Sequence, residues 1–363
     1  MSDDCQAIVI DNGSGVCRVG LAGEDAPTAV FRSVVGVPTV SIQNKRTYVG
    51  EKAVERRRML KVHHPIERGV ITSWGDMEKV WSHALNSVGV PVEDYPVLIT
   101  DALLDLKFNR EEMFSIMFDK FNAMSLYVAY HADLTLYASG RTSGIVVSSG
   151  EGVTNVVPVY DGYHVTHAIC NLGLAGRDLT KFLTTLLSDK GYRFTKAEAE
   201  LSKRFKEKYC FVSQDYDKES NEEKEYELPD GTRIAVSDEL YKCPEALFRP
   251  TLMGIEGMGV HECIFQAVQK CDIDIRKELQ GNIVLSGGTT LFTGFEERLS
   301  KELARGQKGN RVKYGIVADE GREELVWLGG SILSSLSTFQ ENWISKEEYL
   351  EVGPSVAYRK LDR

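Results

Sequence analysis

The sequence has no arrangement of cysteines that could form a disulfide framework or a Cys-x-x-Cys metal site. Its seven cysteines are odd in number and widely spaced, which is typical of a protein from a reducing compartment. His164 with His167, and His261 with Cys263, lack further ligands at a spacing suitable for zinc. We therefore expect a cytosolic chain without disulfides or a zinc site.

The sequence also lacks an excess of positive charge and a long hydrophobic run. Its 43 basic and 53 acidic residues give a net charge of −10, which disfavours sequence-independent binding to nucleic acid or to anionic lipid. The longest uncharged stretch, residues 326–340, is too short and too rich in Ser and Gly to cross a bilayer. The acidic start differs from a secretory signal. We expect a soluble protein that binds no nucleic acid directly and inserts into no membrane.

Two common nucleotide-binding motifs are absent as well. No Gly-Lys pair occurs anywhere in the chain, so there is no Walker loop. Residues 13–18 (GSGVCR) lack the third glycine of the dinucleotide fingerprint, which argues against a nicotinamide oxidoreductase.

What the sequence does contain is a pair of nearly identical segments. Residues 8–15 read IVIDNGSG and residues 145–152 read IVVSSGEG, with the acidic Asp11 replaced by Ser148 in the second copy. A β-branched run that enters a Gly-rich turn forms a hairpin whose exposed N–H groups can hold phosphate. Two copies predict two phosphate loops, and their separation of 137 positions predicts two related halves.

The rest of the chain alternates between helical and strand patterns, and its length favours two domains. In the first half, residues 76–88 and 110–121 have helical periodicity around a strand at 96–100. In the second half, residues 179–187 and 197–209 predict helices. Residues 32–50 predict a small β insert, residues 214–227 an exposed acidic connector, and residues 229–231 (PDG) a hairpin turn. A third glycine-rich segment, residues 283–290 (IVLSGGTT), predicts a strand and a turn before a helix at about 295–303.

Taken in order, several longer segments resemble the actin family, in a superfamily that also holds heat-shock chaperones and sugar kinases. The matching segments are residues 11–15 (DNGSG), 22–27 (AGEDAP), 137–142 (YASGRT), 174–179 (LAGRDL), 285–290 (LSGGTT), 327–333 (WLGGSIL) and 343–346 (WISK). The resemblance covers nearly the whole chain. It implies an α/β, actin-like ATPase fold, a duplicated ribonuclease-H-like architecture, with two lobes and a nucleotide cleft between them.

The resemblance also implies where the lobes begin and end. The first lobe would comprise residues 1–138 and 325–363, with a small β insert at about 33–64. The second lobe would comprise residues 139–324, with a small subdomain at about 175–256.

By the same resemblance, the chain would bind ATP or ADP together with Mg²⁺ or Ca²⁺. Asp11 would hold the cation through water, since hard cations keep several waters and prefer carboxylate and phosphate oxygens. The nucleotide-binding residues implied are Gly13, Ser14, Gly15 and Arg18 at the β-phosphate; Gly150, Glu151, Gly152 and Val153 at the γ-phosphate; and Gly176, Lys203, Lys206, Glu207, Gly288, Thr289 and Phe292 around the adenosine.

Several positions depart from the family pattern. Ser148 and Asn155 stand where actins carry Asp and His, and neither can take up a proton as those residues do. His131 stands where actins carry the Gln that orients the attacking water, so it is the one tentative catalytic residue, because histidine exchanges protons near neutral pH. Arg18 replaces a phosphate-binding Lys, and Glu323 replaces a Lys near the adenine. These changes predict slow or lost hydrolysis.

Contacts with other proteins are also expected to differ from those of conventional actin. Residues 37–48 are shorter than the actin loop that docks on the next filament subunit and lack its Gly- and Met-rich tip, and residues 358–363 replace the usual terminus. The groove that receives amphipathic helices of actin-binding proteins resembles the family pattern more closely than these two segments do. Its residues are Tyr137, Gly140, Thr142, Tyr163, Ile332, Leu333, Leu336 and Thr338.

These observations favour a divergent actin-like cytoskeletal protein that binds adenine nucleotide, hydrolyses ATP weakly or not at all, and acts through partners. Those partners would include actin-binding or cytoskeletal proteins, conventional actin or other actin-related proteins. The expected location is the cytoplasm and its cytoskeleton, with a nuclear pool left open. Two alternatives remain: an active ATPase that forms or joins filaments, and, less favoured, a small-molecule kinase on the same fold, for which no substrate motif stands out.

Overall fold

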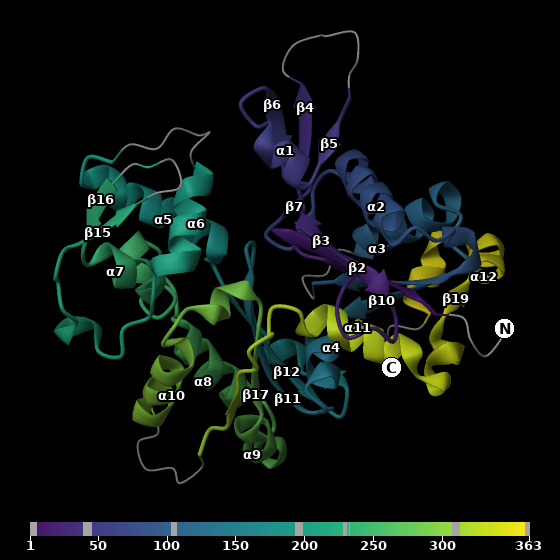
Figure 1. Ribbon diagram of the computed structural model, residues 1–363. Helices are drawn as coiled ribbons and strands as arrows, with labels where there is room; N and C mark the ends of the chain where they lie inside the picture. The colour runs from purple at the N-terminus through teal and green to yellow at the C-terminus, as the bar shows by residue number, and fades with distance from the viewer. Residues whose placement is uncertain are drawn as a thin grey trace. The chain divides into compact units, whose positions relative to one another are not determined.

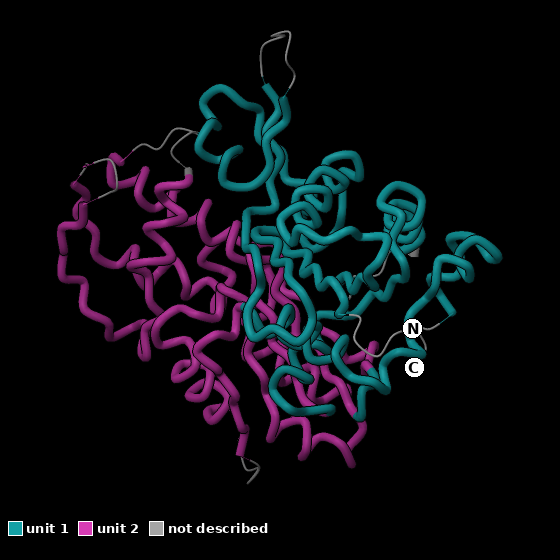
Figure 2. The backbone as a smooth tube through the Cα atoms, turned by 45° about the vertical axis from the view of Figure 1, so that its right-hand side comes forward, with its two compact units in different colours: residues 1–142, 161–163, 324–363 teal, residues 143–160, 164–323 magenta. Residues whose placement is uncertain are grey.

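The fold is described from a computed structural model of residues 6–38, 46–102, 107–192, 199–227, 231, 233–306 and 313–359. The chain divides into two compact units, coloured separately in Figure 2. Unit 1 comprises residues 1–142, 161–163 and 324–363, and unit 2 comprises residues 143–160 and 164–323.

Unit 1 is built on a six-stranded sheet of order β19-β10-β9-β1-β2-β3. Strand β1 pairs antiparallel with β2 through a tight hairpin and parallel with β9 on its other side. The strands are β1 (Ile8–Asn12), β2 (Val16–Leu21), β3 (Ala29–Arg32), β9 (Pro96–Asp101), β10 (Ser125–Tyr130) and β19 (Ile344–Ser345). All five residues of β1 are buried, as expected for a central strand that is covered on both faces.

Alternate residues of β1 enter different core clusters, because successive side chains of a strand point to opposite faces. Ile8 and Ile10 pack in a cluster with Trp81 of α2, whereas Val9 packs in another cluster with Trp327 of α11. The helices of unit 1 are α1 (Glu51–Glu55), α2 (Trp74–Val88), α3 (Lys107–Ser115), α4 (His131–Ala138), α11 (Leu325–Ser335) and α12 (Lys346–Val352).

A small sheet, separate from the main one, completes unit 1. Strands β4 (Val35–Pro38), β5 (Tyr48–Val49) and β6 (Leu60–His63) form it in the order β5-β4-β6, and α1 packs against all three. Figure 1 shows α1 beside these strands. A short β7–β8 hairpin, Ile66–Glu67 with Val70–Ile71, follows.

Unit 2 repeats the plan of unit 1. Strand β11 (Gly144–Ser149) pairs antiparallel with β12 (Thr154–Tyr160) and parallel with β17 (Ile283–Ser286), which in turn pairs parallel with β18 (Ile316–Val317); β14 (Cys170–Leu172) pairs with β12. The order β14-β12-β11-β17-β18 therefore matches β3-β2-β1-β9-β10 of unit 1. This match confirms the duplicated α/β fold that the paired segments predict.

The remaining elements of unit 2 include an amphipathic helix that buries Leu179, Leu183 and Leu187 on one face, the spacing expected for residues 179–187. The helices are α5 (Gly176–Asp189), α6 (Ala199–Tyr209), α7 (Glu239–Glu245), α8 (Val260–Lys270), α9 (Ile273–Gly281) and α10 (Phe295–Gly306). A β15–β16 hairpin, Lys224–Glu227 with Arg233–Val236, forms a separate sheet, and β13 (Tyr163–His164) pairs with β12.

The helix expected at residues 110–121 differs from the prediction. It begins at Lys107 and changes at Ile116 into a π-helical turn that ends at Lys120. Ile116, Met117 and Phe118 are all buried there, and π-helical turns of this kind occur as short interruptions of α-helices. The acidic connector is largely exposed but ends in β15 rather than in a loop.

Several sequence predictions fall outside the described residues. They concern most of the turn at 229–231, the greater part of the shortened segment at 37–48, residues 197–198 of a predicted helix, and the terminal residues 360–363.

A close contact between α4 and α11 provides a test of the packing in unit 1. A Cβ atom at Gly329 would lie 1.9 Å from the Leu134 carbonyl oxygen, so the Gly329→Ala substitution requires the backbone of α4 or α11 to shift. We expect it to lose about 1–3 kcal/mol of unfolding free energy. All four tryptophans belong to unit 1, so urea unfolding followed by tryptophan fluorescence measures this loss.

The matched control is Gly75→Ala in α2, where an added Cβ meets nothing within 4 Å. This change should leave stability unchanged or raise it by up to about 1 kcal/mol, because alanine favours helix. Equal stability of both variants would show that the helices do not pack as closely as described.

Candidate functional site

In unit 1 the carboxylate of Asp11 is the centre of a buried polar cluster at the ends of β1, β2 and β9. Arg18 Nη1 donates to Asp11 Oδ2 at 3.3 Å, and Thr100 Oγ1 donates to Asp11 Oδ1 at 3.0 Å. His131, the first residue of α4, places Nε2 3.6 Å from Asp11 Oδ1. The Asp11 side chain is only 5% exposed, so its charge is compensated by these neighbours rather than by bulk water.

The hydrogen bonds of Thr100 determine which nitrogen of His131 carries a proton. Thr100 Oγ1 has one proton, which it donates to Asp11, and it accepts the Asn12 N–H at 2.8 Å. His131 Nε2 lies 3.0 Å from the same oxygen, so it must donate there. Nδ1 is therefore the nitrogen of neutral His131 that can accept a proton.

The two repeated loops have the same turn. Gly13 N–H donates to Val16 O at 3.0 Å in unit 1, and Gly150 N–H donates to Val153 O at 3.0 Å in unit 2. A Cβ on Gly13 would lie 2.4 Å from Val16 O, so glycine is needed for this close approach. Ser14 Oγ accepts from Gly69 N–H at 3.1 Å, which ties this loop to the β7–β8 hairpin.

The register of each sheet places corresponding polar pairs side by side. Asp11 is opposite Arg18 across β1 and β2, and Ser148 is opposite Asn155 across β11 and β12. Ser148 also lies beside Ser286 of the parallel strand β17. The two halves therefore have the same architecture at this point, but the pair is charged in unit 1 and neutral in unit 2.

The charge of the second loop lies instead on Glu151. Its carboxylate is 2.9 Å from Lys203 Nζ and 3.9 Å from Arg177 Nε. Burial disfavours ionisation of Glu151, but the charge and hydrogen bond of Lys203 outweigh this effect and hold the pKa of Glu151 below its usual value. Lys203 also approaches Glu207, at 3.9 Å, so α6 supplies the cation for this loop.

Other residues implied at the adenosine are joined by short contacts around the start of α5. Gly176 N–H donates to Gly150 O at 2.9 Å, and Thr289 Oγ1 donates to the same oxygen at 2.8 Å. Lys206 is buried and donates to Gly176 O at 2.7 Å, and its burial lowers its pKa. Phe292 is buried as well, whereas Gly288 and Glu207 are exposed. Unit 2 thus brings together the loop at 150–153, α6 and the turn after β17.

Arg18 Nε and Glu323 Oε2 are among the buried polar atoms that lack partners within the described part of the chain. Arg18 Nε has no hydrogen-bond acceptor, although the side chain is only 14% exposed. Glu323 Oε2 in unit 2 likewise has no donor. Buried unsatisfied polar atoms are unfavourable and often mark the place of a missing ligand or water. An anion would satisfy the first, and a hydrogen-bond donor the second.

The residues predicted to form a partner groove all belong to unit 1. Tyr163, Ile332 and Leu336 are exposed by 64%, 39% and 47%. Tyr137 and Leu333 instead pack against the core cluster that contains Val9 and Trp327, while Gly140, Thr142 and Thr338 are exposed. The apolar members are therefore divided between surface and core.

The duplicated sheets, their hairpin loops and the polar ends of their central strands define an α/β protein with the actin-like ATPase fold. A comparison with protein families is specific: the family model described as Actin matches residues 2–362. The chain belongs to the actin family. None of the described helices combines the length and the apolar character that crossing a membrane requires.

Two contacts of the site were not anticipated from the sequence. Thr100 joins Asp11 to His131, and it reaches them because β9 pairs parallel with β1, with Ile10 beside Ile99. Arg177 lies near Glu151 because its N–H donates to Glu151 O at 2.8 Å. The only sequence signal for Thr100 is its position at the end of a predicted strand.

The pKa of Glu151 leads to a test of its pairing with Lys203. Because the pKa in the folded state is lowered, ionised Glu151 stabilises the protein above the ordinary glutamate pKa of 4.5, and this contribution is lost as the pH falls through the lowered value. Glu151→Gln should cost about 1–3 kcal/mol at neutral pH. Denaturant unfolding followed by circular dichroism across pH should show this difference shrinking in acid.

Glu256→Gln is the control, because Glu256 is an exposed acid of unit 2. A cost of Glu151→Gln that stays constant from neutral to acidic pH would contradict the ion pair.

Proposed function

We propose that this actin-family chain binds adenine nucleotide with a divalent cation, hydrolyses ATP slowly or not at all, and acts by engaging protein partners. The observation that carries the proposal is the difference between two equivalent positions. The Asp11–Arg18 pair keeps its charge, whereas the corresponding Ser148–Asn155 pair is neutral.

Nucleotide binding is supported by groups of each unit that suit an anion. In unit 1, Arg18 Nε lacks a partner, and a phosphate oxygen is an acceptor that guanidinium binds well. In unit 2, Glu151 and Gly152 donate no backbone hydrogen bond from their N–H groups within the described residues, and such N–H groups bind phosphate. Lys203 would compensate further negative charge.

A hydrated divalent cation fits the surroundings of Asp11. Within the described residues, no cluster of three or more His, Cys, Asp or Glu side chains could hold a metal ion directly. A single carboxylate is nevertheless the kind of ligand that Mg²⁺ uses when phosphate and water complete its shell. Asp11 would hold this cation through water, and the cation would neutralise phosphate charge.

Slow hydrolysis is supported by the chemistry of three side chains. Neither Ser148 nor Asn155 can accept a proton from water near neutral pH. His131 Nε2 is occupied by its hydrogen bond to Thr100, so only Nδ1 of the neutral ring is available as a base. The charged cluster around Asp11 would retain nucleotide and cation, and Nδ1 of His131 would be the one base left to activate water in place of the Asp and His of actins.

Action through partners is supported by the exposed apolar side chains of unit 1. Tyr163, Ile332 and Leu336 offer anchors of the kind that an amphipathic helix uses. We propose that actin-binding or cytoskeletal proteins, including other actin-family chains, contact this surface in the cytoplasm.

The hydrolysis proposal is tested by restoring the residues that conventional actins carry. Phosphate release from the purified chain with Mg·ATP should be well below that of conventional actin filaments. The triple variant Ser148→Asp, Asn155→His, His131→Gln should raise it at least about tenfold, because a proton acceptor and a water-orienting amide are regained.

Nucleotide binding must be measured on the same preparations, so that low turnover is not confused with an empty protein. Asp11→Asn is the matched control, and it should weaken nucleotide retention instead of raising turnover. Wild-type turnover equal to that of actin filaments would refute slow hydrolysis. Turnover that requires an added small-molecule hydroxyl acceptor would favour a kinase.

The shortened segment at 37–48 leads to a separate prediction about assembly. Loss of an apolar anchor at a repeated interface can cost about 2 kcal/mol or more per contact. The isolated chain should therefore remain monomeric in Mg²⁺ and moderate salt, where conventional actin assembles. Sedimentation velocity and high-speed pelleting, with conventional actin in parallel, measure this directly, and pelleted filaments of this chain alone would contradict it.

A further inference from the structure

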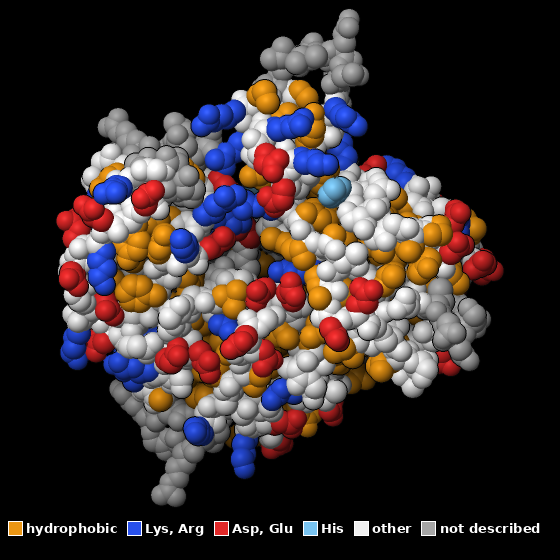
Figure 3. All heavy atoms as spheres, in the orientation of Figure 1, with side chains coloured by type: hydrophobic (Ala, Val, Ile, Leu, Met, Phe, Trp, Pro, Cys, Tyr) orange, Lys and Arg blue, Asp and Glu red, His pale blue; other side chains and the backbone are white. Residues whose placement is uncertain are grey.

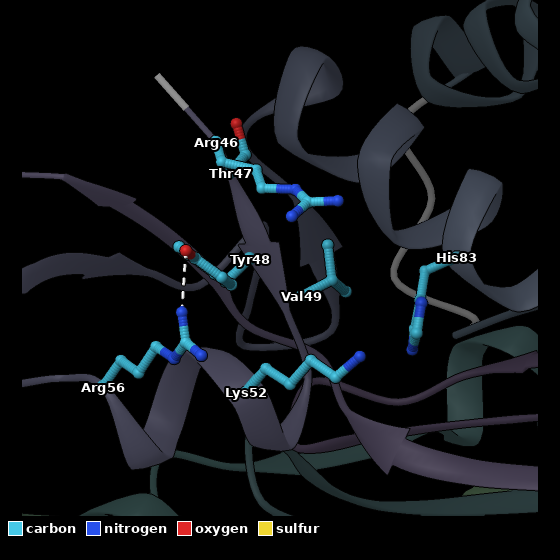
Figure 4. A pocket seen from close by; sticks show the side chains of 7 residues that line it. All are labelled: Arg46, Thr47, Tyr48, Val49, Lys52, Arg56 and His83. Carbon is cyan, nitrogen blue, oxygen red and sulfur yellow. Dashed lines mark hydrogen bonds between the residues drawn. The ribbon is translucent and has the colours of Figure 1, made fainter. Parts of the chain in front are cut away.

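Unit 1 contains a cavity of about 350 Å³ beside its small sheet, away from the polar cluster around Asp11. Arg46, Thr47, Tyr48, Val49, Lys52, Arg56 and His83 line it. They come from β5 and the residues before it, from α1 and its end, and from α2. Figure 4 shows the side chains of Arg46 and Lys52 extending toward the space beside Val49. Cavities of roughly 300–1,000 Å³ are typical of sites for small ligands.

The lining of this cavity is basic, although the chain as a whole carries a net charge of −10. It comprises two guanidinium groups, one ammonium group, an imidazole, two hydroxyl groups and no carboxylate. Figure 3 shows Lys and Arg side chains gathered over α1 and the small sheet. Burial lowers the pKa of His83, and the positive charge of Lys52 lowers it further.

The acidic neighbours on α1 do not line the cavity. Glu51 Oε1 lies 3.5 Å from Arg32 Nε on β3, and Glu55 is exposed and absent from the lining. Arg46, Lys52 and Arg56 therefore line a space to which no acidic residue of the described chain contributes.

Contacts within the protein hold several of the side chains that line the cavity. Arg56 Nη1 donates to Tyr48 Oη at 2.8 Å, and the guanidinium lies 4.6 Å from the centre of the Tyr48 ring. Since Tyr48 Oη accepts from Arg56, its own proton remains available to a ligand. His83 is held by an edge-to-face contact with Phe31, with ring centres 4.6 Å apart.

From this arrangement we propose that the cavity binds a phosphate group, either of a small free phosphate compound or of a phosphorylated side chain on a partner. A phosphate group carries a charge of about −1.5 to −2 near neutral pH, which offsets much of the charge of three neighbouring cations, and its oxygens match the bidentate geometry of the guanidinium groups. Arg46, Lys52 and Arg56 supply the charge, and Tyr48 and Thr47 supply neutral donors. The site is distinct from the proposed nucleotide site, since it shares no residue with it.

Isothermal titration of the full chain with pyrophosphate, at fixed ionic strength and with chelator present, tests this assignment. The wild type should bind, and Lys52→Glu should weaken binding at least about tenfold, because it removes one charged contact and adds repulsion. Arg46→Glu should act in the same direction. Both side chains are exposed, so circular dichroism should show an unchanged fold.

Lys61→Glu is the matched control, because Lys61 is an exposed cation on β6 outside the lining. It makes the same charge change and should alter binding by less than about twofold, as expected for a screened surface charge. Equal weakening by Lys52→Glu and Lys61→Glu would overturn the site, as would no binding or binding that Lys52→Glu leaves intact.

A second titration with a phosphoserine peptide and its unphosphorylated form identifies the source of the phosphate. Binding of the phosphopeptide that Lys52→Glu abolishes assigns a partner's phosphorylated side chain. Binding of pyrophosphate alone assigns a free compound.

Discussion

The buried carboxylate of Asp11 is the interaction on which the organisation of unit 1 depends. It lies where β1 and β9 end and β2 begins, and Arg18, Thr100 and His131 each contact it from a different element. A carboxylate that is 5% exposed can remain ionised only if such partners replace water. Asn12 extends the network, since it accepts from Trp81 Nε1 at 3.0 Å and thereby joins the cluster to the core beneath α2. The packing of unit 1 and the polarity of its loop therefore depend on the same small group of residues.

Unit 2 shows what the same backbone does without that charge. Its hairpin has the same turn, and its central strand has the same neighbours, yet Ser148 and Asn155 need no buried counterion. The charged residue of this loop is instead Glu151, three residues after Ser148, and it contacts Lys203. A duplicated fold can thus keep its architecture while one copy loses the groups that would move protons, because strand pairing is made by the backbone. This asymmetry is the basis for separating nucleotide binding from hydrolysis in the proposed function.

Much of the fold could be predicted because its signals are local or repeated. The paired segments predict equivalent hairpins, and the leucine spacing from Leu179 to Leu187 predicts α5. The contact of Thr100 with Asp11 could not be predicted, since it depends on the parallel register of two strands and joins residues 89 positions apart in sequence. The basic cavity could not be predicted for a similar reason, because α1, α2 and the residues around β5 each contribute to its lining. The π-helical turn that begins at Ile116 could not be predicted either, because the helical spacing of Met113, Ile116 and Met117 also fits an ordinary α-helix.

The central claim is that the charge around Asp11 retains nucleotide and cation, while the neutral pair in unit 2 leaves the nucleotide uncleaved. The most direct measurement is to identify and quantify the nucleotide that the chain retains after purification, with and without a chelator. The account predicts stoichiometric ATP that is lost when the cation is removed. Retained ADP in place of ATP would contradict this prediction, and protein without nucleotide in the presence of Mg²⁺ would show that Asp11 and Arg18 serve the fold alone.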